Sequence, residues 1–145
     1  MQHTATDTAC VVLESFSLGR MKVSIPTTHY ELDLVDSAFP SGRSAAEQAC
    51  IPTGSRLHGV VHARALKMHR ANAGGVFIEP VQGHPRSVQG RVMATDTVNN
   101  KILTHVVIPM WIAVPAGQAA ADFATGELIN FYVQSGTSFV AAAVV

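Results

Sequence analysis

Two histidines four positions apart, His58 and His62, have the residue type and spacing that suit metal chemistry. Imidazole is a good ligand for Zn, Ni or Cu, and the two side chains share a face in a strand and in a helix alike. A transition-metal site needs three or four ligands, however, and no carboxylate or thiol lies nearby at a paired spacing. Histidines scattered over the surface are therefore the simpler interpretation, since the chain has seven of them.

A second group that could bind a metal is formed by His105, Met110 and Trp111. Imidazole and thioether together suit Cu(I), and an indole ring can lie over the bound cation. Packing of the methionine and the tryptophan in the core, beside an incidental histidine, is the simpler explanation. A transition metal is thus the only cofactor that the sequence suggests, and nothing in the sequence requires one.

A basic stretch in the middle of the chain is the candidate for polyanion binding. Between Arg56 and Lys101 it carries seven lysines and arginines but only two acidic residues. Such a stretch can attract single-stranded nucleic acid or pair with the acidic ends of another copy. The residues that we expect to contact phosphates are Arg64, Lys67, Arg70, Arg86 and Arg91. Because few aromatic residues accompany them to stack bases, we do not expect nucleic acid to be the main ligand.

Catalytic motifs are missing from the sequence. It contains no GxSxG, P-loop, HExxH or GxGxxG pattern. His84, Asp96 and His105 are possible general bases, but no nucleophile or oxyanion donor can be identified beside them. We therefore expect a non-enzymatic protein.

The composition indicates one domain that self-associates. Of 145 residues, 48% are hydrophobic and 14% are charged, against about 25% charged residues in an average soluble domain. The formal net charge is zero, which does not favour a globally basic nucleic-acid binder. Either polar uncharged residues cover the surface, or apolar faces are buried in a homo-oligomer or against a protein partner. We expect the second.

The cysteines and the start of the chain indicate a reducing compartment. Cys10 and Cys50 are either a disulfide or two buried thiols, and we expect thiols because two cysteines in a chain of this length do not form a disulfide framework. The opening residues lack the basic and then apolar pattern of a signal peptide, and no apolar run approaches 18 residues. We expect a cytoplasmic protein with no membrane span.

The element expected to position these side chains is a β-hairpin from Val88 to Val107. Two apolar arms flank a polar turn, residues 96–100, in which Asn99 and Asn100 tolerate a left-handed backbone. The second arm runs on to Pro109, where we expect the ladder to break. Residues 110–114 would then form a separate short strand.

The segment from Leu57 to Arg70 can be read as a strand or as a helix. Its second half has good helix propensity, but Gly59-Val60-Val61 favours a strand, and we expect a strand throughout. As a strand it places His58, His62, Arg64 and Met68 on one face. In segment 127–134, successive side chains alternate between two faces, as in a strand. We expect this segment and the strand at 57–70 to lie on either side of the hairpin.

Shorter elements fill the remainder of the chain. Strands are predicted at 10–16, 21–25, 30–35, 76–81 and 139–145, where the last either ends the sheet or packs on another subunit. One helical turn is predicted at 118–123, and another begins at the capping box formed by Ser44 and Glu47. Many short strands separated by Gly, Pro and Asn turns predict a mainly β fold. We expect a small OB-like Greek-key barrel over residues 56–145, on which an arm, a hairpin and a short helix from residues 1–55 pack.

From Gly90 to Val133, about a third of the chain, the order of elements resembles small OB-fold barrels. More narrowly, it resembles the periplasmic copper- and silver-binding metallochaperones of that fold. The matching elements are Gly90-Arg91-Val92, Asp96, His105, Met110 with Trp111, and Gly126-Glu127. This resemblance implies a metal bound by one histidine and two methionines under a tryptophan, but Met110 has no second methionine two positions on.

Overall fold

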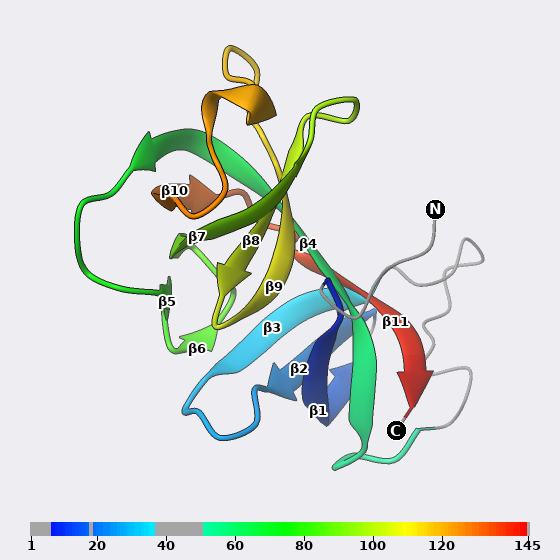
Figure 1. Ribbon diagram of the computed structural model, residues 1–145. Coiled ribbons are helices and arrows are strands. Elements are labelled where there is room, and N and C mark those ends of the chain that lie inside the picture. The colour runs from blue at the N-terminus through cyan, green and yellow to red at the C-terminus, as the bar shows by residue number, and fades with distance from the viewer. Residues whose placement is uncertain (1–6, 18, 37–50, 145) are drawn as a thin grey trace.

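In the described part of the chain, eleven strands form a single mixed sheet that curls into a partial ring (Figure 1). The computed structural model describes residues 7–17, 19–36 and 51–144, with the backbone alone for 142–144. The elements are β1 (Ala9–Ser17), β2 (Arg20–Ser24), β3 (Glu31–Asp36), β4 (Arg56–Arg70), β5 (Phe77–Glu79), β6 (Gln82–Gly83), β7 (Ser87–Asp96), β8 (Lys101–Val106), β9 (Ile108–Ala113), the helical turn η1 (Ala120–Asp122), β10 (Leu128–Val133) and β11 (Ser138–Val144). The predicted mainly β fold is confirmed. The capping box at residues 44–47, and Cys50, lie outside the described residues, while Cys10 carries a free thiol.

The long strand β4 is the spine of the sheet, which confirms a strand over the whole segment. Along one edge it pairs with β1 at residues 56–59 and then with β9 at 61–64. Along the other edge it pairs with β11 at 57–62 and then with β10 at 65–70. As a result β1, β2, β3 and β11 gather at one end of β4, and β7 to β10 gather at the other (Figure 1).

A bulge in β4 changes which side chains face the core. Up to Ala65 the odd-numbered residues are buried, but Leu66 and Lys67 are both exposed opposite Tyr132, and Met68 is buried. One extra residue in a strand reverses the face of every residue that follows it. The prediction that Met68 shares a face with His58, His62 and Arg64 is therefore wrong.

The predicted hairpin is present as β7 and β8. Asn100 has a left-handed backbone with φ of 55°, and the Asp96 carboxylate accepts hydrogen bonds from the Asn99 backbone N–H (3.1 Å) and side-chain amide (2.8 Å). Both hydrogen bonds lower the pKa of the Asp96 carboxyl. The bond from the Asn99 side chain has the larger effect. The polar turn thus closes the hairpin through its own side chains.

The position of the break after β8 differs from the prediction. The ladder breaks at Val107, where φ is 73°, and β9 already includes Pro109. Val106 pairs with Ile108, so β9 folds back on β8 after a single residue. Pro109 is tolerated because the parallel pairing with β4 starts only at Met110.

This fold-back also changes the neighbours of the hairpin. β10 lies beside β7, as predicted. β4 does not pair with β7 or β8, because β9 occupies the free edge of β8 and β10 occupies the free edge of β7. The C-terminal strand β11 does not end the sheet either, since it lies between β3 and β4.

The pairings form two circuits of five strands that share β4. In the first, β1, β2 and β3 pair in succession, β3 runs parallel to β11, and the path returns through β4 to β1. In the second, β7, β8 and β9 pair in succession, β9 runs parallel to β4, and the path returns through β10 to β7. One contiguous core, which includes Phe131 and Phe139, extends through both circuits. No helix within the described ranges is long and apolar enough to cross a membrane.

Candidate functional site

A pocket of about 470 Å³ lies over β4 where the two circuits meet. Five strands and one turn contribute to it: the middle of β4, the end of β9, the starts of β8 and β11, the end of β3, and residues 134–136 between β10 and β11. The lining residues are Val35, His62, Ala63, Arg64, Lys101, Trp111, Ala113, Gln134, Ser135, Gly136 and Ser138. We call it the crossing pocket.

Strand register explains the shape of the crossing pocket. Ala113 pairs with Arg64 on one side and with Lys101 on the other, so its methyl group lies between two long cationic side chains. Directly paired residues point to the same face, and adjacent strands lie about 4.8 Å apart, which places the Cα atoms of Arg64 and Lys101 about 10 Å apart. The small alanine leaves the floor open between them.

The charge in the crossing pocket is positive. Among the described residues that line it, none is an aspartate or a glutamate. One salt bridge is formed between described residues, that of Arg70 with Glu127. Arg64 therefore forms no salt bridge with a described carboxylate. Lys101 lies opposite Asp96, whose carboxylate accepts hydrogen bonds from Asn99, and the charge of Lys101 makes a smaller contribution than these bonds to lowering the pKa of that carboxyl. Two cations that line one pocket on either side of an alanine are suited to an anion.

The indole ring of Trp111 forms one wall and is fixed in place. Its Nε1–H donates a hydrogen bond of 3.0 Å to Oδ2 of Asp7, whose side chain is 3% exposed. His62, the direct partner of Trp111 across the strands, lies beside it. Because the indole N–H is occupied, Trp111 offers a ligand its ring surface and not a hydrogen-bond donor.

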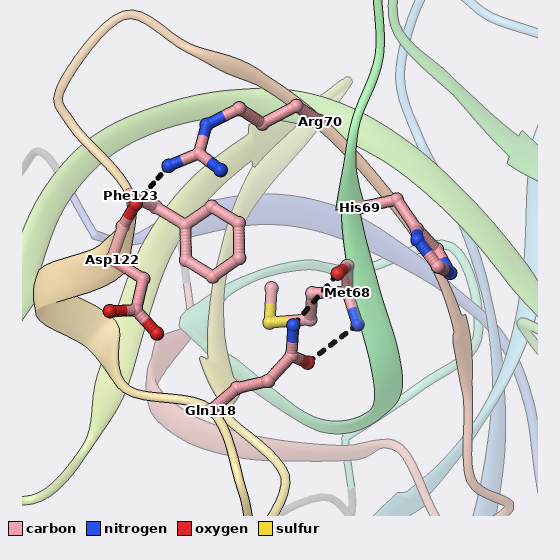
Figure 2. A pocket seen from close by; sticks show the side chains of 6 residues that line it. All are labelled: Met68, His69, Arg70, Gln118, Asp122 and Phe123. Atoms are coloured by element: carbon pink, nitrogen blue, oxygen red, sulfur yellow. Dashed lines mark hydrogen bonds between the residues drawn. The ribbon is translucent and has the colours of Figure 1, made fainter.

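A second pocket, of about 540 Å³, lies at the far end of β4 (Figure 2). Here the Gln118 side chain accepts a hydrogen bond from the Met68 backbone N–H (2.8 Å) and donates one to the Met68 carbonyl (2.9 Å). The Arg70 guanidinium lies 5.1 Å from the Phe123 ring centre and donates to the Asp122 carbonyl. These polar groups satisfy one another and hold the loop that contains η1 against β4, so we assign this pocket a structural role.

Glu127 completes this attachment of the loop to β4. One carboxylate oxygen accepts a hydrogen bond from the Ala124 N–H, and the other pairs with the Arg70 guanidinium, both at 2.6 Å. The backbone hydrogen bond, followed by the bond to Arg70, lowers the pKa of Glu127 below its ordinary value of 4.5. Glu127 is therefore ionised at neutral pH. It pairs with Arg70, which the sequence suggested as a phosphate contact.

The predicted metal ligands are not brought together. Met110 is 1% exposed in the core, whereas His105 is exposed on the opposite face of the sheet. His58 pairs with Cys10, and His62 lies four residues along the strand, which is about 13 Å. In the part of the chain that the structure describes, no three His, Cys, Asp or Glu residues lie close enough to hold a metal ion.

The predicted polyanion contacts are separated by the structure into two kinds. Arg70 and Arg91 are bound by the loop after η1, since Arg91 donates to the Gly126 carbonyl at 3.0 Å. All five side chains are exposed, and of the other three, Arg64, Lys67 and Arg86, it is Arg64 that lines the crossing pocket. Sequence reasoning missed Lys101 as a site residue, because only the pairing of β8 with β9 and of β9 with β4 brings it near Arg64.

Comparison with known protein families, curated proteins and solved structures finds no match to this chain. The case for a function therefore rests on the geometry of the crossing pocket.

Proposed function

We propose that this protein is a non-enzymatic binding module that holds an anion in the crossing pocket. The observation that carries the proposal is that Arg64 and Lys101 flank Ala113 in a pocket whose described lining residues include no carboxylate. Hydroxyl and amide groups of Gln134, Ser135 and Ser138 stand in the same lining and can add hydrogen bonds. A bound anion would gain charge-assisted hydrogen bonds from both cations.

The proposal includes an OB-like architecture. Its support is that the two circuits have the same pairing pattern: three successive antiparallel strands, then one parallel pairing from the third strand, then two antiparallel pairings back to the first. In the second circuit a helical turn, η1, joins the third strand to the strand that pairs with the first. Five-stranded Greek-key barrels of the OB type bind ligands on their sheet faces and loops.

Neutralising either cation is expected to weaken anion binding about tenfold, which is 1.4 kcal/mol. Arg64→Gln and Lys101→Gln keep side chains of similar reach but remove the charge. Binding of inorganic phosphate and of a short single-stranded DNA, each measured by calorimetry at low salt, tests this. Lys67→Gln is the matched control, because Lys67 is an exposed cation on the same strand that does not line the crossing pocket. Absence of binding to both probes, or an equal loss in the control, would contradict the proposal.

Self-association is a second candidate function, favoured by one exposed apolar pair. Leu66 is 46% exposed and Tyr132 is 65% exposed, and they lie opposite each other at the β4 bulge. A second copy that packs there would cover apolar surface that now faces water. We expect light scattering at micromolar concentration to give a mass above that of one chain, and Leu66→Lys to return the protein to the monomer. A monomeric wild-type protein would rule this candidate out.

A further inference from the structure

We propose, resting on the anion-binding function above, that the ligand is a small molecule that joins a planar aromatic ring to its anionic group. The ring would lie against the indole of Trp111, and the anionic group would lie between Arg64 and Lys101. Nucleotides are the class of metabolite that this arrangement fits best, and a nucleoside monophosphate is the probe that we choose.

The size of the crossing pocket argues for more than a bare ion. Its volume of about 470 Å³ falls within the range of roughly 300–1,000 Å³ found for small-molecule sites. A single phosphate group between the two cations would leave most of that space filled by water. The ligand therefore has a further part, which the other walls must accommodate.

The remaining walls indicate what that part is. The Trp111 indole lines the pocket, and its N–H is bonded to Asp7, so the part of the side chain left for a ligand is its apolar ring. Val35 and Ala113 add small apolar surface, and Trp111 is the one aromatic side chain among the described lining residues other than the imidazole of His62. A fixed indole face favours a flat π system, since an aromatic ring stacks on another in offset or edge-to-face geometry. Every nucleobase has a flat π face, so stacking on an aromatic side chain does not depend on which base is bound.

The spacing between the two subsites sets the length of the ligand. Trp111 and Ala113 are two residues apart on β9 and point to the same face, which separates their Cα atoms by about 7 Å. The anionic group, above Ala113, and the ring, at Trp111, are thus joined by a linker of about that length. A sugar meets this requirement, and Ser135 and Ser138 are placed in the lining to bond its hydroxyls.

The test uses Trp111 itself, because it is the sole tryptophan of the chain. Adenosine monophosphate, inorganic phosphate and adenosine are titrated separately while the intrinsic fluorescence is recorded. We expect the nucleotide to change the emission and to bind at least tenfold more tightly than phosphate, and adenosine to bind more weakly than the nucleotide. Arg64→Gln should weaken the nucleotide and phosphate by the same factor.

A variant at the ring subsite separates stacking from charge. In Trp111→Leu, followed by calorimetry, we expect the tenfold advantage of the nucleotide to disappear while phosphate affinity stays unchanged, which also shows that the pocket is still folded. If this variant does not fold, Trp111→Phe keeps a smaller ring and should retain part of the advantage.

The possible failures are distinguishable. Equal affinities for nucleotide and phosphate would overturn this inference and leave the anion-binding proposal standing. Affinity that grows with the length of single-stranded DNA, and exceeds that of the nucleotide, would replace the small ligand by a polymer. Binding of neither phosphate nor nucleotide would overturn both proposals.

Discussion

Replacing Gly59 by alanine is expected to lower the free energy of unfolding by about 3 kcal/mol, because the added methyl group has no space. A Cβ at this position would lie 2.8 Å from Cε2 of Phe139, and still closer to its Cζ and to the Val140 carbonyl oxygen. Phe139 is fully buried in the shared core, and Val140 O is backbone, so neither neighbour can move without shifting β11. Urea denaturation of the wild type and the variant measures the difference.

A double-mutant cycle provides the control for Gly59. Phe139→Leu removes the ring edge that the new methyl group would meet, at its own cost in packing. We expect Gly59→Ala to cost less in the Phe139→Leu background than in the wild type, because residues in contact do not contribute additively. Equal costs in both backgrounds would mean that the contact with the ring is not the cause. No measurable loss in the single variant would refute the close approach itself.

Removing the side chain of Gln118 is expected to cost about 2 kcal/mol, because it leaves the Met68 backbone N–H and carbonyl without partners. Met68 is 2% exposed, and β9 ends before it reaches this part of β4. The Gln118 amide takes the place of a paired strand there, with bonds of 2.8 and 2.9 Å. In Gln118→Ala we expect a lower unfolding free energy and faster hydrogen exchange of the Met68 amide.

Gln118→Glu is the matched variant for this interaction. A carboxylate can still accept the Met68 N–H but cannot donate to the Met68 carbonyl. We expect the Met68 amide to remain protected from exchange in this variant at neutral pH, while the protein is less stable than the wild type. Slow exchange of the Met68 amide in Gln118→Ala would show that the amide does not depend on Gln118.

The elements that could be predicted from the sequence are those that local interactions stabilise. The turn between β7 and β8 is closed by Asp96 and Asn99, three residues apart, and by a left-handed Asn100. The strand β4 was predictable from Gly59-Val60-Val61, which lies within the segment. Such interactions involve neighbours in the chain, so residue types alone reveal them.

Predictions that depended on pairing between distant segments were wrong or incomplete. The bulge that turns Met68 into the core exists only because β10 pairs with β4 on both sides of it. Pro109 has no backbone N–H to donate, yet it lies inside β9. It is tolerated there because the pairing of β9 with β4 begins only at the next residue, Met110. Neither condition is visible in the residues nearby, since each is set by a partner strand far along the chain.

The same division holds for the candidate site. The sequence by itself determined that the chain is mainly β, that its middle is basic, and that it carries one tryptophan beside a methionine. Only the tertiary structure decided that His105 pairs with Pro109, so that it lies on the face of the sheet opposite the buried Met110, which separates the predicted metal ligands. It also decided that Lys101, Ala113 and Arg64 share one row across three strands, because β9 folds back at Val107 and then runs parallel to β4. Residue types set the available chemistry, and strand register, which depends on contacts distant in sequence, sets which groups meet.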